Sequence, residues 1–384
     1  MVYFDNAATT FPKPECVYDF MNTFYRECGG NAGRGSHKLS IGAGKMVSET
    51  RNRLKQLLHC ENKQIVFTPS ATIALNMILQ GILSGQTAQK RNVYISPFEH
   101  NAVTRVLHYY ENIGKITVQL LAIKNDLTYD FEGIQAQFAK DSPDLMVVSH
   151  ASNVIGLVSP VEELCSIAKK YGAVTVIDMA QTAGLVNLNV GLETIDFAVF
   201  AGHKTLYGPT GIGGFAMKPD FELNPVLFGG TGFESANQDM PNDIPQRYEM
   251  GTLNIAGIAG LYASLNWILD EGVDYLWEHE QLKRKELLKI LRSYHFVKIV
   301  GDNESNQYVG IVSCVIDGLP SDTAASVFAE RNIAVRSGLQ CAPLAHKTLG
   351  TFPSGSIRFS CSAFTSDADF EELVKTLDWI KKNL

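Results

Sequence analysis

The sequence predicts an α/β protein with two domains: a large one built around a mostly parallel sheet, and a smaller α+β domain. Short apolar runs alternate with helical segments up to about residue 215, as in β-α-β units. Two of the runs, 174–177 and 197–200, are short and mainly apolar, which is typical of strands buried on both faces. After residue 255, long helical segments give way to shorter strands. We place the large domain at residues 15–255 and the small domain at residues 1–14 plus 256–384.

Size, composition and charge narrow the class of protein. With 384 residues, 45% of them hydrophobic and 19% charged, the chain is large enough for two buried cores. Its net charge of −7 offers no electrostatic reason to expect nucleic acid or an anionic membrane as partner. No apolar run reaches transmembrane length and the start does not resemble a signal peptide, so a cytoplasmic protein is expected. Seven cysteines without a C-x-x-C pair argue against a disulfide framework or a structural zinc site.

The first two predicted helices each follow a polar or glycine-rich segment. The stretch FDNAATTFPKPE is rich in turn residues and leads into a helix beginning near Pro14, where proline suits a helix start. On its own, such a stretch is expected to be a frayed terminus. Residues 29–42 are predicted to form a glycine-rich loop before a helix over 43–59. Glycine allows close approach of a ligand, although most such loops only connect elements.

A strand, QIVFT, is followed by a turn and a helix that starts around Ala71 and Thr72. A helix N-terminus presents free N–H groups and the positive end of the helix dipole, which suits a phosphate. The simpler interpretation is that Ser70 or Thr72 only caps the helix. Both interpretations are compatible.

Two further strands end in polar residues. NVYIS leads to Glu99-His100-Asn101, and LMVVS leads to Asn153 and a helix over 161–171. Ligands bind at the carboxyl ends of strands in open α/β sheets. A lone histidine there is nevertheless more often a hydrogen-bonded loop residue than a catalyst.

The central stretch brings two reactive groups to the ends of adjacent strands. Strand 174–177 ends at Asp178, and strand 197–200 leads to His203 and Lys204 in a loop rich in Gly and Pro. A desolvated lysine favours its neutral amine and becomes nucleophilic toward an aldehyde. A carboxylate facing a pyridine nitrogen keeps that nitrogen protonated. These are the two protein groups that pyridoxal phosphate (PLP) requires. Taken alone, the lysine is better explained as a surface residue and the aspartate as a helix cap. The pair, with Gln181 nearby, favours a cofactor site.

The second half of the chain is less regular at first. Segment 228–254 has no clear periodicity, so it is either a disordered insertion or a loop ordered by a partner subunit. Helical sequence returns over 255–293, followed by the strands HFVKIVG and VGIVSCVI and a helix over 322–331. A last helix is expected to begin near Ser366, where Ser-Asp-Ala-Asp is a suitable cap.

The motif AGHKTLYGPTGIGG, together with VIDMAQ, resembles the fold-type-I PLP enzymes of aminotransferase class V. Within them it is most similar to the cysteine desulfurase and selenocysteine lyase group. The resemblance extends from FDNAATT to SIRFSCSAFT, so it covers almost the whole chain. It implies a fold-type-I PLP-dependent transferase in which the N-terminal segment folds back over the active site, with Ala7 and Ala8 facing the substrate.

The resemblance also implies the roles of several residues around the cofactor ring. Lys204 would be the Schiff-base lysine and Asp178 the partner of the ring nitrogen. Gln181 would bind the phenolic oxygen, and His100 would stack on the ring and move protons. Asn153, in a motif similar to S-N-x-x-G, would contact the cofactor hydroxyl or the substrate.

Another group of residues is implied to hold the cofactor phosphate: Ala71, Thr72, His203, Gly251 and Thr252. The last two lie in RYEMGTLN, which resembles E-x-G-T-x-N and would reach across a two-fold interface. The active site of a homodimer would then be shared between subunits. The family commonly has hydroxyls at positions 71 and 201, and both are alanine here.

Cys341 is the candidate nucleophile among the cysteines. It lies in a loop near Arg336, His346 and Lys347, and a cationic, partly exposed setting lowers a thiol's pKa. The stretch RSGLQCA matches the family pattern R-x-G-x-x-C-A of the second, short-loop group of desulfurases. The two residues before the cysteine are often histidines in that group and are Leu-Gln here.

The other cysteines lack such a context. Cys314 and Cys361 lie in apolar strands and are expected on core faces. Cys165 falls within a helix. The remaining three are Cys16, Cys28 and Cys60.

Besides Asn153, three residues are expected at the substrate. Arg358, in SIRFS, matches the family's substrate-carboxylate arginine, and a guanidinium binds a carboxylate through two parallel hydrogen bonds. An arginine in a surface ion pair is the commoner case in proteins generally. His37 is placed by the resemblance at the mouth of the site, and Arg336 near the substrate.

Together these features predict a PLP-dependent desulfurase acting on L-cysteine, or on L-selenocysteine as a selenocysteine lyase does. Cys341 would take the sulfur as a persulfide, release alanine and pass the sulfur to an acceptor protein or small thiol. A class V aminotransferase or a β-eliminating lyase would use Lys204, Asp178 and Arg358 without Cys341. A non-catalytic homologue that binds a partner protein is the alternative of another class.

Overall fold

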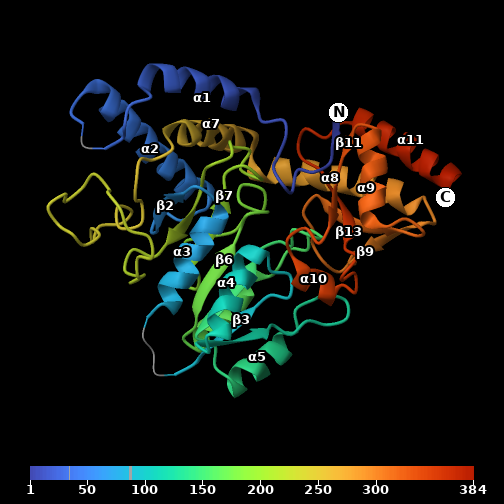
Figure 1. Ribbon diagram of the computed structural model, residues 1–384, viewed down its shortest axis with the longest axis horizontal. Coiled ribbons are helices and arrows are strands. Elements are labelled where there is room, and N and C mark those ends of the chain that lie inside the picture. The colour runs from blue at the N-terminus through green and yellow to red at the C-terminus, as the bar shows by residue number, and fades with distance from the viewer. Residues whose placement is uncertain (34, 86–88) are drawn as a thin grey trace.

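The computed structural model describes residues 1–33, 35–85 and 89–384 of the chain, so Arg34 of the predicted loop 29–42 lies outside the described residues. A seven-stranded sheet with helices on both faces forms the larger part, and a four-stranded sheet with its own helices lies beside it (Figure 1). Within the described ranges, none of the helices combines the length and apolar character needed to cross a bilayer.

The seven-stranded sheet has the order β2-β8-β7-β6-β5-β3-β4. Its strands are β2 (Gln64–Thr68), β3 (Arg91–Ile95), β4 (Ile116–Leu120), β5 (Leu145–Ser149), β6 (Val174–Asp178), β7 (Phe197–Ala201) and β8 (Gly213–Met217). Only β8 runs against its neighbours, and β2 and β7 both pair with it antiparallel. The other strands therefore all point the same way, which confirms the mostly parallel sheet.

Helices cover both faces of this sheet. On one face lie α3 (Ala71–Leu83) and α4 (Asn101–Asn112); on the other lie α2 (Lys38–Leu57), α5 (Phe131–Lys140), α6 (Val161–Lys170) and α7 (Ile255–Glu271). Successive residues of β5 show the division: Val147 packs toward α3 and α4, whereas Met146 and Val148 pack toward the other layer. Because both faces are buried at the centre of the sheet, β5 and β7 are buried along their whole length and apolar without alternation, which is the feature that made such strands recognisable in the sequence.

The second sheet is antiparallel, in the order β12-β13-β10-β9. Its strands are β9 (Val297–Val300), β10 (Ile311–Ile316), β12 (Arg336–Gly338) and β13 (Ser356–Ser360). The associated helices are α8 (Val273–Arg292), α9 (Ser321–Glu330), α10 (Pro343–Thr348) and α11 (Asp367–Asn383). The predicted cap of the last helix is a full capping box between Ser366 and Asp369.

The N-terminus is not frayed. Strand β1 (Val2–Tyr3) pairs parallel with β11 (Ile333–Ala334), and Phe4 is fully buried. Both chain ends therefore lie at the small sheet (Figure 1). Composition alone misidentified this polar stretch, because the long-range contacts that order it are made to residues 174 to 354 positions away.

Two predicted helix boundaries were wrong. Helix α2 begins at Lys38 rather than at residue 43, because His37 caps it through Nδ1, which accepts a hydrogen bond from the Ser40 N–H at 3.3 Å. The predicted helical stretch 255–293 is two helices, since Gly272 adopts a φ of +90° between them. The first helix, α1 (Glu15–Cys28), begins directly after Pro14 as predicted.

Segment 228–254 contains no helix or strand, but its end is anchored. Glu249 forms a bidentate ion pair with Arg51 of α2, at 3.0 and 2.7 Å, and also accepts the Phe67 N–H at 2.7 Å. Helix α7, which follows, packs on α1 and α2. The domain boundaries at residues 15, 255 and 256, and the ordering of this segment by a partner subunit, stay predictions.

Candidate active site

A cavity lies where the parallel strands of the large sheet end. The strands β3, β5, β6 and β7 each deliver a loop to it, and α3 begins at its wall. It is lined by these sequence-predicted residues: Ala71, Thr72, His100, Asn153, Asp178, Gln181, His203 and Lys204. The structure therefore brings eight candidates from five separate segments into one site.

Lys204 and Asp178 are the charged pair of this cavity. Asp178 is the last residue of β6, and Lys204 lies three residues beyond β7, which is the neighbouring parallel strand. Burial lowers the pKa of Lys204 to about 8, although Asp178 opposes that shift. Burial likewise raises the pKa of Asp178, against the hydrogen bond that its carboxylate accepts from the Ala180 N–H. About a tenth of the Lys204 amine is therefore neutral at pH 7, as a nucleophile or proton acceptor requires.

The wall formed by α3 suits an anion. Ala71 is the first residue of the helix, and Ser70 is its cap, with Oγ accepting the Ile73 N–H at 3.3 Å. Thr72 is therefore not the cap, and it lines the cavity. Because the first N–H groups of a helix lack intrahelical partners, this end attracts negative charge.

Unpartnered buried atoms flank Lys204 on both sides. Among the described residues, His203 Nδ1 and Thr205 Oγ1 are buried and have no hydrogen-bond partner. Burial lowers the pKa of His203 to about 4, so the ring is neutral near pH 7. Buried polar groups are almost always paired in proteins, so His203 Nδ1, which lines the cavity together with the N-terminus of α3, fits the binding of a phosphate-bearing group. Thr205 was not predictable as a site residue from its sequence context, although it adjoins the central lysine.

His100 is both a capping residue and part of the cavity wall. Its Nδ1 accepts the Ala102 N–H at 3.0 Å at the start of α4, so the proton of the neutral ring sits on Nε2. Burial, reinforced by the positive charge of Lys204, lowers the pKa of His100 to about 4. The ring therefore offers an uncharged face and one N–H to the cavity.

Glu99, next to His100, is a fully buried carboxyl for which the sequence predicted no role. Its Oε1 accepts the Ser149 N–H at 2.6 Å, and Oε2 accepts the Ser149 hydroxyl at 2.8 Å. Burial raises the pKa of Glu99 to about 8. It links the loop after β3 to the end of β5, and so supports the cavity from behind.

The N-terminal segment, residues 1–14, closes over the cavity. Gln181 Nε2 donates to the backbone oxygen of Ala7 at 2.9 Å. The Thr10 hydroxyl donates to the backbone oxygen of Lys204, also at 2.9 Å. The expected fold-back of this segment is present, and it acts directly on the backbone that carries the lysine.

Cys341 lies at the rim. It is exposed and shares a surface groove with Thr72 and His100, two residues that also line the cavity. It is close enough to Lys204 to affect the pKa of that amine. Burial is the largest cause and lowers this pKa, whereas Cys341 raises it. By contrast Cys314 and Cys361 are buried in the small-sheet core, as predicted. An exposed thiol therefore stands beside an amine of lowered pKa.

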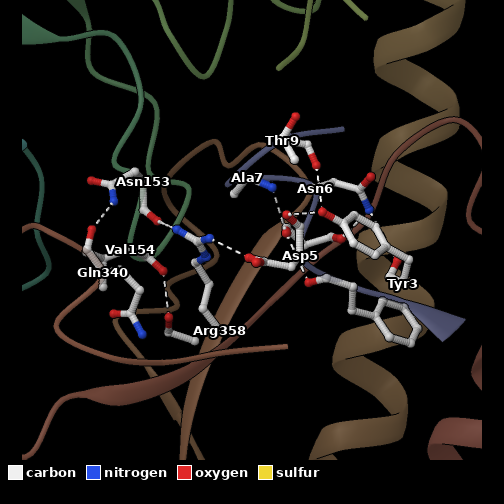
Figure 2. A network of polar contacts seen from close by, with 12 residues as sticks. Tyr3, Asp5, Asn6, Ala7, Thr9, Asn153, Val154, Gln340 and Arg358 are labelled. Carbon is white, nitrogen blue, oxygen red and sulfur yellow. Dashed lines mark hydrogen bonds and ion pairs between the residues drawn. The ribbon is translucent and has the colours of Figure 1, made fainter. Parts of the chain in front are cut away.

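Arg358 is buried rather than exposed on the surface. Its side chain is only 3% exposed, and Nη2 forms an ion pair with Asp5 at 2.8 Å. Nη1 donates to the backbone oxygen of Asn153 at 2.9 Å, and the Asn153 amide in turn donates to the backbone oxygen of Gln340 at 2.7 Å. Figure 2 shows this chain of contacts, which runs from the N-terminal segment to the loop of Cys341. Within the described part of the chain, Nε of Arg358 is buried and has no partner.

Six expected site residues do not line the cavity of this chain: Cys341 and Arg358, described above, and the four that follow. His37 is exposed and caps α2. Arg336 is exposed in β12, paired in register with Arg358. Gly251 and Thr252 are also exposed, and Thr252 lines a separate hollow. Their roles toward substrate or toward a second subunit stay predictions.

A family comparison accounts for this arrangement: the model of the aminotransferase class-V family matches residues 2–373. The chain belongs to the class-V aminotransferase family. Its match covers both sheets and the whole cavity, so the α/β fold expected from the sequence is confirmed at the level of the family as well.

Similar class-V proteins carry one recurring name. A probable cysteine desulfurase of Pyrococcus abyssi is 30% identical over 391 residues, covering 100% of this chain and 95% of the relative. One of Methanothermobacter thermautotrophicus is 31% identical, covering 99% and 94%. A cysteine desulfurase of Haloferax volcanii is 29% identical, covering 98% and 89%.

Solved structures agree with these relatives. The apo cysteine desulfurase of Thermococcus onnurineus superposes with a TM-score of 0.92 at 29% identity, covering 100% of this chain and 95% of the other. An S-sulfonic acid form of a cysteine desulfurase from Escherichia coli superposes with a TM-score of 0.87 at 25% identity, covering 100% and 95%. The class-V fold is therefore complete in this chain.

Proposed function

We propose that this protein is a PLP-dependent cysteine desulfurase that moves the sulfur of L-cysteine onto Cys341 and releases alanine. The observation that carries the proposal is the placement of Lys204 and Asp178 in one buried cavity with the exposed Cys341 at its rim. The names of the class-V relatives support it, since they recur across the full length of the chain. An aminotransferase would need no exposed thiol at this rim.

The residues of the cavity fit the cofactor. Lys204 would carry it, Asp178 would face the ring nitrogen, and His100 and Gln181 would lie along the ring. The unpartnered His203 Nδ1 and the free N–H groups at the start of α3 would hold the phosphate. When bound, PLP supplies an electron sink for the bonds of the substrate's α-carbon.

The chain's own groups perform the remaining tasks. Arg358 would bind the substrate carboxylate through its guanidinium. The neutral amine of Lys204 takes the α-proton, which its lowered pKa permits. The Cys341 thiolate then forms a bond with the substrate sulfur while the carbon–sulfur bond breaks and the carbon is protonated, so the products are alanine and a persulfide on Cys341.

We further propose that the enzyme is a homodimer with a shared site and that an acceptor protein or small thiol removes the persulfide sulfur. The exposed Gly251 and Thr252 of one subunit would complete the phosphate site of the other. L-Selenocysteine, which differs from L-cysteine in one chalcogen atom, would enter by the same contacts.

Two substitutions test the function. Cys341→Ala should abolish the formation of persulfide and alanine from cysteine while the yellow absorption band of the bound cofactor remains. Cys16→Ala, which removes the other exposed thiol, serves as the matched control and should keep full activity. Lys204→Ala should remove the band. Unchanged desulfuration in Cys341→Ala would exclude the sulfur relay, and pyruvate in place of alanine would indicate β-elimination.

A further inference from the structure

The reactive loop carries two consecutive residues in an unfavourable backbone conformation. Gln340 has a φ of +40° and Cys341 a φ of +57°, a left-handed region that residues with a Cβ rarely adopt. Such conformations persist only where the surroundings hold them, and they cluster at functional sites. Contacts of the surrounding residues must therefore hold Gln340 and Cys341 in this conformation.

The backbone is held on its carbonyl oxygens. The Asn153 amide donates to the oxygen of Gln340 at 2.7 Å, as Figure 2 shows. The N–H of Asn101, the first residue of α4, donates to the oxygen of Cys341 at 2.8 Å. Asn153 lines the cavity, and Asn101 directly follows His100, which also lines it, so the backbone of the cysteine is tied to the cavity wall.

The Gln340 side chain is anchored on the opposite side, away from the cavity. It is 5% exposed, and its Nε2 donates to the backbone oxygen of Ser356 at 2.9 Å. That contact defines the orientation of the amide, because a carbonyl oxygen only accepts. Gln340 Oε1 therefore faces Nε2 of His346 at 2.7 Å, and the imidazole must donate there.

The network ends in α10 and the turn after it. His346 is fully buried, and burial lowers its pKa, so the ring is neutral. With its proton on Nε2, Nδ1 accepts the Thr351 hydroxyl at 2.7 Å. Every polar atom of the chain from Ser356 through Gln340 and His346 to Thr351 is thus satisfied, and such a network rigidifies the segment that it connects.

We propose that Gln340 is a positioning residue: its side chain, locked by His346 and Ser356, holds Cys341 in the left-handed conformation that presents the thiol at the cavity rim. The inference rests on the proposed role of Cys341 as the sulfur nucleophile. It assigns Gln340 no part in proton transfer, because both functional atoms of its amide are engaged in the small domain. The residue acts only through the geometry of its neighbour.

The test separates positioning from general structural damage. Gln340→Ala should lower kcat for desulfuration by about 10- to 100-fold, the loss expected when a reacting group is misplaced by about 1 Å, while KM for L-cysteine stays unchanged. Exchange of the α-hydrogen of L-alanine in D2O should also stay at the wild-type rate, since it depends on Lys204 and Arg358 and not on Cys341. Leu339→Ala, the neighbouring truncation, is the matched control and should leave both rates unchanged.

A second variant keeps the test decisive. Thr351→Val removes the hydroxyl at the far end of the network and should lower kcat in the same direction by a smaller factor, even if Gln340→Ala does not fold. Wild-type kcat in the soluble variants, or an equal loss of alanine exchange and desulfuration, would overturn the proposal. Failure of the desulfurase function itself appears separately, as desulfuration that persists in Cys341→Ala.

Discussion

The ion pair between Asp5 and Arg358 should control the order of the N-terminal segment that closes the cavity. The two side chains are 2.8 Å apart, with exposed fractions of 17% for Asp5 and 3% for Arg358. Removing one partner of a buried pair leaves the other charge uncompensated in a poorly solvated site. The carboxylate of Asp5 belongs to the N-terminal segment that carries Ala7 to the cavity. Asp5→Ala therefore leaves Arg358 without the negative charge that neutralises it.

The size of the effect follows from this geometry. Breaking a buried ion pair costs about 3–5 kcal/mol, and the lower end applies because Asp5 is partly exposed and Arg358 keeps its bond to the Asn153 oxygen. About 3 kcal/mol corresponds to a factor of about 100 in the equilibrium for local opening. Asp5→Asn keeps an oxygen acceptor and loses only the charge. Since a charge-assisted hydrogen bond is about twice as strong as a neutral one, Asp5→Asn should shift the equilibrium for local opening by a factor of about ten.

Native-state hydrogen exchange measures this opening directly. The N–H of Phe4 donates to the Ala334 oxygen at 2.9 Å, and that of Ala7 to the Ser360 hydroxyl at 2.8 Å. Their protection should fall about 100-fold in Asp5→Ala and about tenfold in Asp5→Asn. Equal protection in Asp5→Ala and in Asp19→Ala, a control on the exposed face of α1, would refute the reasoning.

Two further perturbations test the site and its anchor. Because burial lowers the pKa of Lys204 to about 8, the rate at which the apoprotein takes up PLP should rise tenfold per pH unit below pH 8 and level off above it, as the neutral fraction of the amine does. Asp178 raises that pKa, so Asp178→Asn should move the plateau to lower pH; an unshifted plateau would contradict this. Glu249→Ala leaves Arg51 without its bidentate partner, which should lower the free energy of local opening by about 3 kcal/mol. Trypsin cleavage after Arg247 should then accelerate about 100-fold. Unchanged cleavage would show that the pair does not anchor segment 228–254.

The parts of the site that were predictable are those that local sequence determines. A strand buried on both faces is apolar throughout, and parallel neighbours end at the same edge, so Asp178 and Lys204 had to meet once their strands were recognised. Helix starts were less certain. A histidine is an unusual cap, so nothing in the composition of residues 29–42 announced that His37 begins α2.

The contacts that could not be predicted join residues far apart in the chain. Asp5 and Arg358 are 353 positions apart, and Asn153 and Gln340 are 187 apart. Each pairing exists because the small sheet and the N-terminal strand pack against the ends of β5 and β6, and no periodicity encodes that packing. Polar residues in these stretches therefore looked like ordinary loop residues.

Gln340 shows how such long-range contacts change the interpretation of a departure from the family pattern. Taken with the sequence alone, the replacement of a histidine beside the reactive cysteine suggests a lost proton acceptor. In the structure the same side chain is buried, and both of its polar groups are bonded within the small domain. A residue that cannot reach the reacting atoms cannot be deficient in proton transfer to them. Its chemical consequence has to pass through the position of Cys341, and that position depends equally on Asn153, whose neighbouring contact is the arginine expected to bind the substrate.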